Sequence, residues 1–173
     1  NATLDVQPGD FGYHRTITFF NDCDHFAWEK SEHPCDLRSG VICSPNNFAY
    51  SEPLAEGTIR ITALANFEYW NGLDEHTYEL EKLRWCDRIT AAAVRFMPDY
   101  RSHVIDTDMF TPTTILRFTG HDNGAVYGAP TKQLDGTTHL ENLFICGTDQ
   151  GFVGVIGSII SGISMANRHC LRD

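Results

Sequence analysis

The last thirty residues constrain the fold of this chain more than any other segment. Residues 142–146 (Asn-Leu-Phe-Ile-Cys) end in an apolar run that Gly147 halts, and a second periodic apolar segment begins near Val153 and continues to Leu171. Very little chain lies between these two segments, so they have almost no loop to connect them. The sequence therefore predicts a buried strand, a tight turn and a helix over residues 142–171.

The residues of this turn suit a site that holds a nucleotide-like cofactor. Gly151, Gly154 and Gly157 have no Cβ, so another group can approach the backbone closely. The free N–H groups at the start of the helix carry partial positive charge and would face an electron-rich group. Asp149 could accept hydrogen bonds from the hydroxyls of a sugar or polyol. An alternative remains open, in which the glycines permit close helix packing and Asp149 merely caps the helix.

Size and charge limit the classes of partner. The 173 residues suffice for one domain, or for a domain and a piece of another, and the net charge is −10 with no basic patch. This acidity argues against a nucleic-acid partner. It gives no support for docking to anionic lipid headgroups, but an apolar substrate held in a membrane is still compatible with it. Asp149, Gln150 and several glycines interrupt the apolar window 143–166, which argues against a membrane-spanning helix.

The cysteines and the first residues indicate a cytoplasmic protein, and a membrane-peripheral location is compatible with them. Six cysteines occur at irregular spacing, which we interpret as reduced thiols, with Cys146 and Cys170 on apolar faces. The first ten residues lack the basic flank and the apolar stretch of a signal peptide.

The rest of the chain predicts a mixed fold of the α+β or α/β class. Strands are expected at residues 14–20, 39–44, 58–65 and 103–110, most simply in a mostly antiparallel mixed sheet. A long amphipathic helix is expected over about 74–97, with Asp74 as its N-cap and Pro98 after its end. Its expected apolar stripe comprises Tyr78, Leu80, Leu83, Ile89, Ala92, Ala93 and Phe96.

The C-terminal motifs resemble those of a known family. The tail 142–151 and its helix, together with the segments 111–114 (Thr-Pro-Thr-Thr) and 124–128 (Gly-Ala-Val-Tyr-Gly), resemble the C-terminal part of phytoene-desaturase-like FAD oxidoreductases. That group includes carotenoid desaturases, carotenoid isomerases and retinol-saturase-like enzymes, and is more distantly similar to flavin amine oxidases. The resemblance implies a split FAD domain with a substrate domain inserted into it. Residues 1–110 would then be part of the substrate-binding domain and residues 111–173 the C-terminal segment of the FAD-binding domain.

The same resemblance implies roles for particular residues. Asp149 would bind the ribityl chain of FAD, and the backbone at the start of the last helix would face the pyrimidine edge of the flavin. The implied cofactor-binding residues are Gly147, Asp149, Gln150, Gly151, Val153, Gly154, Val155 and Ile156. Tyr127 and His121 become candidates for lining the reaction site, although either could be an ordinary exposed loop residue. No catalytic residue is assigned beyond these two candidates.

One departure from the family pattern affects the expected biochemistry. Such enzymes begin with a strand, a Gly-x-Gly-x-x-Gly turn and a helix that hold the ADP half of FAD, and no set of glycines in this chain has that spacing in that context. We therefore expect a C-terminal fragment of a larger enzyme that transfers hydride between the flavin and an apolar, polyene or isoprenoid-like substrate. The isolated chain would be inactive and would bind FAD weakly or not at all.

Two other functions remain open on sequence grounds. The first is a small zinc-binding module, because potential ligands are frequent in the first third of the chain: His14, Cys23, Asp24, His25, His33 and Cys35. Their pairs are separated by a single residue, unlike those of closed zinc sites, so no metal ligand is assigned. The second is a non-catalytic domain, in which aromatic residues wall an apolar cavity or fill a core: Phe19, Phe20, Phe26, Phe48, Tyr50, Phe67, Tyr69 and Trp70. Trp28, Trp70 and Trp85 are expected to pack in the core or at its rim.

Overall fold

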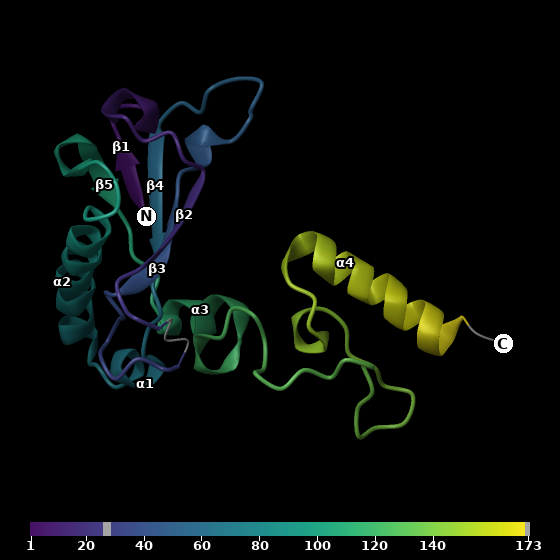
Figure 1. Ribbon diagram of the computed structural model, residues 1–173. Helices are drawn as coiled ribbons and strands as arrows, with labels where there is room; N and C mark the ends of the chain where they lie inside the picture. Colours follow the sequence, from purple (N-terminus) through teal and green to yellow (C-terminus); the bar gives the residue numbers. More distant parts are fainter. Residues whose placement is uncertain (26–28, 172–173) are drawn as a thin grey trace. The chain divides into compact units, whose positions relative to one another are not determined.

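The chain divides into two compact units, Asn1–Thr114 and Ile115–Asp173. A computed structural model describes residues 1–25 and 29–171 (Figure 1). The division lies close to the boundary that the sequence analysis places after residue 110. The functional roles expected for the two parts stay predictions.

The described residues of the first unit contain a five-stranded antiparallel sheet. Its strands lie in the order β2-β3-β4-β1-β5. They are β1 (Ala2–Leu4), β2 (Ile17–Asn21), β3 (Ser39–Cys43), β4 (Gly57–Thr62) and β5 (Val104–Thr107). The predicted antiparallel sheet is thus confirmed, although the strands are shorter than expected. β1 was not predicted, because three residues are too few to show an alternating pattern.

The long predicted helix is confirmed as α2 (Glu75–Ala93), which follows the short helix α1 (Phe67–Asn71). The side chain of Asp74 caps α2 by accepting a hydrogen bond from the backbone N–H of Thr77 at 3.1 Å. The predicted apolar stripe was wrong at Leu80 and Leu83, which are 55% and 65% exposed. Leu80 is about 200° around the helix from Tyr78, so it cannot share the face that Tyr78 buries. Trp85 occupies the buried face instead.

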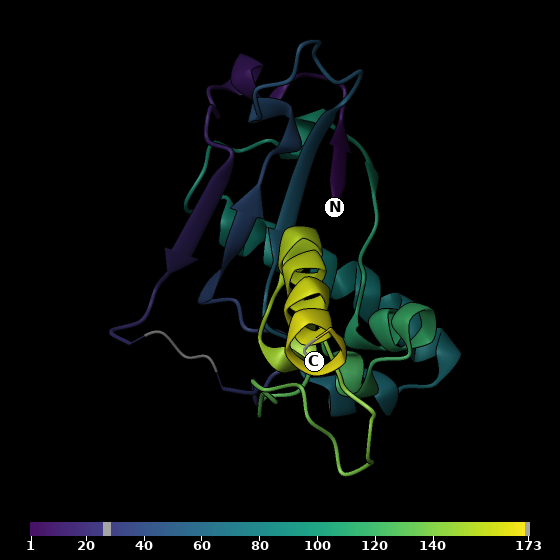
Figure 2. The same ribbon diagram turned by 90° about the vertical axis from the view of Figure 1, so that its right-hand side faces the viewer.

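The main core lies between one face of the sheet and the C-terminal half of α2, which covers that face (Figures 1 and 2). Its buried residues are Ala2, Leu4, Tyr13, Phe20, Ile42, Ile59, Ala93, Met97 and Tyr100. The opposite face of the sheet is open at its β2 edge, where Ile17 is 46% and Phe19 is 80% exposed. Neighbouring residues of a strand point to opposite faces, which explains why Phe20 is buried and Phe19 is not.

A second core forms where α1 and α2 meet residues 31–37. Trp70 of α1 and Trp85 of α2 are 1% and 4% exposed, and both pack with Cys35. The indole N–H of Trp70 donates to the carbonyl of Pro34 at 3.1 Å, and the side chain of Asn66 donates to the carbonyl of Ser31 at 2.9 Å. These bonds fix the 31–37 segment against α1. The expected packing of Trp70 and Trp85 is confirmed, while Trp28 and Phe26 lie outside the described residues.

The second unit has helices but lacks the strand that the sequence predicted. Helix α3 (Pro112–Thr119) leads into it, and α4 (Gly154–Met165) continues as a wider π turn, Ala166–Cys170. The predicted C-terminal helix is confirmed. In the predicted strand at 142–146, only Phe144 pairs, in an isolated bridge with Thr137. A strand needs a neighbouring strand to take up its backbone groups, and none lies beside residues 142–146 in the described chain.

Two surface features follow from this arrangement. Cys146 and Cys170 are exposed, contrary to the expected apolar faces. For Cys146 the reason is that residues 142–146 do not lie within a covered sheet. All six cysteines, which lie within the described residues, are free thiols. No helix among residues 1–25 and 29–171 combines the length and the apolar character needed to cross a bilayer.

The opposite exposures of two isoleucines in the sheet give a test of its orientation. Ile42 is completely buried under α2, so Ile42→Ala should lower the free energy of unfolding by about 2–5 kcal/mol through lost burial and a residual cavity. Ile17→Ala on the open face of the neighbouring strand should cost less than about 1 kcal/mol. Urea denaturation of both variants measures the difference. Equal losses would contradict the assignment of the two faces.

Candidate functional site

The turn that the sequence singled out is a compact, glycine-bounded loop. A single 3-10 turn, Thr148–Gln150, separates Gly147 from Gly151. Gly147 has φ 89° and Gly151 has φ 110°, backbone conformations that side chains with a Cβ rarely adopt. The two glycines therefore allow the chain to enter and leave the turn within five residues, and they leave Asp149 at its exposed centre.

Asp149 connects this turn to the 128–133 segment. Its carboxylate Oδ1 accepts the backbone N–H of Ala129 at 2.7 Å, and its carbonyl accepts the N–H of Gln133 at 2.9 Å. A Cβ at Gly128 would collide with this carboxylate, so a glycine is required there. The structure thus brings the end of the 124–128 segment next to the C-terminal turn.

A chain of buried and partly buried hydrogen bonds fixes the turn to α4. The backbone N–H of Gly147 donates to Ser161 Oγ at 2.6 Å, and that hydroxyl donates to the side-chain oxygen of Gln150. The Gln150 amide then donates to the carbonyl of Leu134 at 2.9 Å. Ser161 is fully buried and Gln150 is 3% exposed. The Gln150 side chain is therefore a structural part of the turn, and its backbone N–H donates to the carbonyl of Gly147 at 3.2 Å.

The start of α4 is uncapped and open. Val153 precedes the helix and offers no side-chain cap to the first-turn N–H groups. Gly154 has φ 76°, and a Cβ built there would meet no atom within 4 Å. Val155 and Ile156 follow with exposures of 79% and 74%. Free N–H groups, open space and exposed apolar side chains thus occur together at this helix end.

Tyr127 and His121 occupy different places in the second unit. Tyr127 is one residue from Gly128, next to the Asp149 contact, and is 67% exposed. His121 begins a separate short turn, where its Nδ1 donates to the carbonyl of Ala125 at 2.9 Å. Because Nδ1 carries the proton in this hydrogen bond, Nε2 is the unprotonated nitrogen of the neutral ring. No hydrogen bond between the described residues joins His121 to the Asp149 turn.

The 111–114 segment has a structural role in the first unit. The hydroxyl of Tyr78 on α2 lies 2.7 Å from Thr111 Oγ1 and 3.2 Å from Thr114 Oγ1. Burial alone would raise the pKa of Tyr78, but the threonine hydroxyls and Lys82 lower it. These hydroxyl contacts hold the start of α3 against α2.

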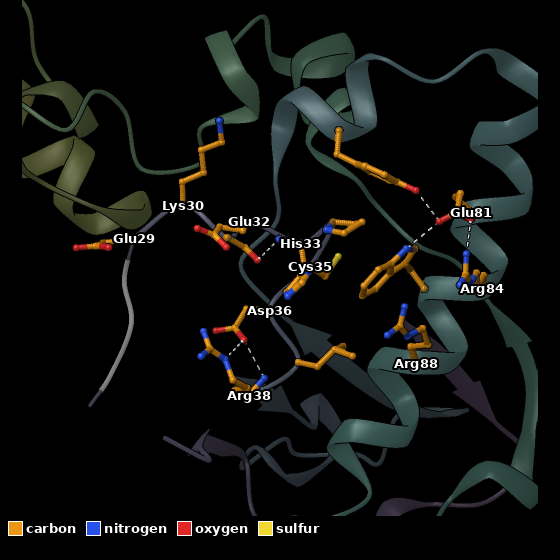
Figure 3. Close-up of a pocket in the computed structure, with 15 residues that line it drawn as sticks. Glu29, Lys30, Glu32, His33, Cys35, Asp36, Arg38, Glu81, Arg84 and Arg88 are labelled. Carbon is orange, nitrogen blue, oxygen red and sulfur yellow. Dashed lines mark hydrogen bonds and ion pairs between the residues drawn. The ribbon is translucent and has the colours of Figure 1, made fainter. Parts of the chain in front are cut away.

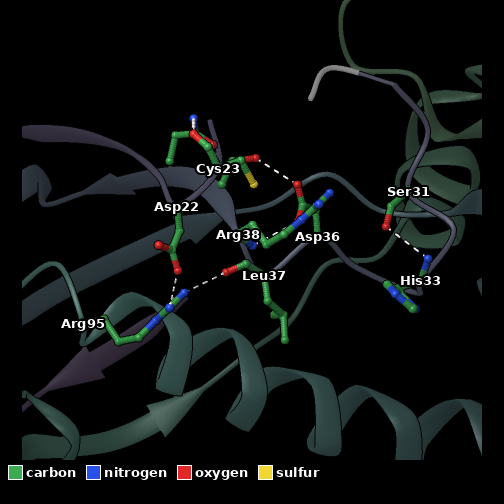
Figure 4. Close-up of polar contacts among 10 residues, drawn as sticks. Asp22, Cys23, Ser31, His33, Asp36, Leu37, Arg38 and Arg95 are labelled. Atoms are coloured by element: carbon green, nitrogen blue, oxygen red, sulfur yellow. Dashed lines mark hydrogen bonds and ion pairs between the residues drawn. The ribbon is translucent and has the colours of Figure 1, made fainter. Parts of the chain in front are cut away.

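The residues proposed for zinc do not converge. Among the described residues, no three His, Cys, Asp or Glu side chains lie close enough to share a metal ion. Cys23 and His33 lie apart, on opposite sides of Asp36 and Arg38 (Figure 4). Cys35 is 3% exposed, and burial raises its pKa to about 11, so it is a protonated thiol at neutral pH. The described geometry gives the zinc alternative no support.

The turn depends on two residues that were not predicted from the sequence, Ser161 and Ala129. The sequence does contain a signal for Ser161. A serine on the buried face of an apolar helix needs a hydrogen-bond partner for its hydroxyl close by. Ala129 had none, because it contributes only its backbone N–H.

The chain was also compared with known proteins. No family model, no curated protein and no solved structure matches it. The geometry of the C-terminal turn is therefore the basis for any functional assignment.

The buried hydrogen-bond chain predicts different costs for two serine substitutions in α4. Ser161→Ala would leave the Gly147 N–H and the Gln150 oxygen without partners and should lower the free energy of unfolding by about 1–3 kcal/mol for each buried group. Ser164→Ala, at an exposed position of the same helix, should change it by less than about 0.5 kcal/mol. Chemical denaturation of the two variants provides the comparison. A neutral Ser161→Ala variant would show that the turn does not depend on this contact.

Proposed function

We propose that the chain is the C-terminal part of an FAD-dependent oxidoreductase of the phytoene-desaturase-like type, acting on an apolar, polyene or isoprenoid-like substrate. The observation that carries the proposal is the position of Asp149. A backbone N–H holds its carboxylate at the centre of an exposed turn, directly before an uncapped helix. The isolated chain is proposed to be inactive, because no segment of it has the dinucleotide-binding motif.

The residues of the turn fit the middle of an FAD molecule. The backbone N–H of Ala129 donates to Asp149 Oδ1, and no hydrogen bond from the described residues reaches Oδ2. An ionised carboxylate can accept several hydrogen bonds, so Oδ2 is available to a hydroxyl of a ribityl chain. Gly147 and Gly151 carry no side chain that would obstruct such a chain.

The start of α4 fits the ring end of the same cofactor. Its first-turn N–H groups and the helix dipole favour electron density at the polar edge of a flavin. Val155 and Ile156 would pack beside the ring and exclude water. When bound, the flavin would supply the hydride chemistry, while these residues bind and orient it.

The exposed surface of α4 supports a larger cofactor domain around it. Five apolar residues of the helix are 49% to 79% exposed: Val155, Ile156, Ile159, Ile160 and Ile163. A helix that is apolar on most of its faces is typical of a buried element. We propose that the remaining part of the FAD domain of the same enzyme covers this surface.

The first unit would contribute to substrate binding. Its aromatic residues divide into buried ones, such as Phe20 and Trp70, and exposed ones, such as Phe19, Phe48 and Tyr50. The exposed group offers apolar contacts to an isoprenoid-like molecule. A cytoplasmic enzyme with peripheral access to membrane-held substrate is consistent with such contacts.

The test uses the natural protein expressed from the complete gene, which should contain a Gly-x-Gly-x-x-Gly segment and purify with flavin absorbance. Asp149→Asn should weaken FAD binding by about tenfold or more, because its amide oxygen keeps the Ala129 N–H while an N–H₂ group, which cannot accept a hydroxyl hydrogen, replaces the Oδ2 that would face the ribityl chain. Asp122→Asn, an exposed change in a separate turn, should leave FAD binding unchanged. Retained absorbance and FAD affinity in Asp149→Asn, or a complete protein without flavin, would reject the proposal in favour of a non-catalytic domain.

A further inference from the structure

A cleft lies in the first unit, and none of its lining residues belongs to the proposed cofactor site. It has a volume of about 810 Å³ and lies between residues 29–38 and the middle of α2, with Tyr69 of α1 at one wall. Figure 3 shows Cys35 and His33 between the Asp36–Arg38 pair and the α2 residues Glu81, Arg84 and Arg88. This volume is within the range of small-molecule binding sites.

Two carboxylates in the cleft are already occupied by neighbours. Asp36 is 6% exposed and accepts hydrogen bonds from the backbone and side chain of Arg38, at 2.9 and 3.1 Å, and from Ser39 at 3.0 Å. Glu81 accepts the Tyr69 hydroxyl at 2.7 Å, the Trp85 indole N–H at 2.9 Å and Arg84 at 3.0 Å. Both therefore remain ionised and are neutralised locally, so neither is available to a cation from solution.

Arg88 differs from the other two arginines of the cleft. Its guanidinium lies 4.2 Å from the centre of the Trp85 ring, and no carboxylate of residues 1–25 or 29–171 lies within ion-pair distance of it. Stacking on an aromatic ring uses the face of a guanidinium and leaves its in-plane N–H donors free. The nearby Cys35 is a neutral thiol, so it does not supply the missing negative charge.

The neighbours of Arg88 add donors and hold it in place. Arg84 contacts Glu81 through one terminal nitrogen, and Arg38 contacts the Asp36 side chain through Nε, so each keeps further N–H groups. Trp85 is 4% exposed and bonded to Glu81, which fixes the ring on which Arg88 lies. Glu29 and Glu32 also line the cleft, and their charges disfavour a long polyanion there.

We propose that this cleft binds the oxyanion of a small organic molecule, a carboxylate or phosphate group, with Arg88 as the principal charged contact and Trp85 and Tyr69 against the organic part. Oxyanions of this kind accept two parallel N–H bonds from a guanidinium. Glu81 acts as a positioning residue, because it fixes Trp85 and Arg84 rather than contacting the ligand.

The test measures binding of phenyl phosphate and of benzoate to the 173-residue chain by titration calorimetry, at an ionic strength held constant with sodium chloride. Saturable binding of at least one probe is expected, and the tighter of the two identifies the preferred oxyanion. Arg88→Gln should weaken that binding by about tenfold or more. Arg60→Gln, at an exposed arginine on β4 of the same unit, is the matched control and should not change it.

A second variant and an optical signal locate the binding. Arg88→Lys keeps the charge but loses the planar fork, so its affinity should lie between those of the parent chain and Arg88→Gln. Ligand binding should change tryptophan fluorescence, and Trp85→Phe should remove that change. The proposal is rejected if neither probe binds saturably, or if Arg60→Gln weakens binding as much as Arg88→Gln does.

Discussion

The second unit depends on one buried hydroxyl. Ser161 accepts the N–H of Gly147 and donates to Gln150, so a single side chain of α4 connects both ends of the turn to the helix. Without it, the buried Gln150 amide oxygen and the partly buried Gly147 N–H would lack partners, a cost comparable to a substantial part of the stability of a small domain. The position of Asp149 follows from this constraint, because Asp149 lies between the two residues that Ser161 holds.

The first unit depends on a different kind of constraint, the burial of two indole rings. Trp70 and Trp85 pack against Cys35 and order the 31–37 segment, which has no regular secondary structure of its own. Each indole N–H has one fixed acceptor, Pro34 for Trp70 and Glu81 for Trp85. Because buried rings with bonded N–H groups have little freedom, the cleft beside them has a defined wall.

The sequence predicts those parts of the fold whose signals are local. The start of α2 was predictable because Asp74 combines an N-cap side chain with a following 3.6-residue pattern. The phase of the helix was not, since Leu80 and Leu83 are apolar yet exposed, and only the position of the sheet decides which stripe is buried. The prediction of a strand at 142–146 was wrong for a related reason. An apolar run indicates burial, while a strand also requires a neighbouring strand that accepts its backbone hydrogen bonds.

For the candidate sites, too, local features could be predicted from the sequence but tertiary contacts could not. Glycines at 147, 151 and 154 and the acid at 149 indicated an open turn from the sequence, and the structure has such a turn. The hydrogen bond between Ala129 and Asp149 and the stacking of Arg88 on Trp85 could not be predicted, because no sequence spacing specifies either contact.

Both proposed sites rest on charged groups that are held in place, rather than on groups that merely lack partners. An exposed carboxylate or guanidinium is hydrated, so the absence of a protein partner costs little and by itself indicates no ligand. Asp149 and Arg88 differ from other exposed charges because a backbone N–H orients one and a buried indole orients the other. Orientation before binding reduces the conformational entropy lost on binding, which raises affinity without adding a contact. The two groups have opposite charge and lie in different units, so a ligand that neutralises one has no electrostatic reason to bind at the other.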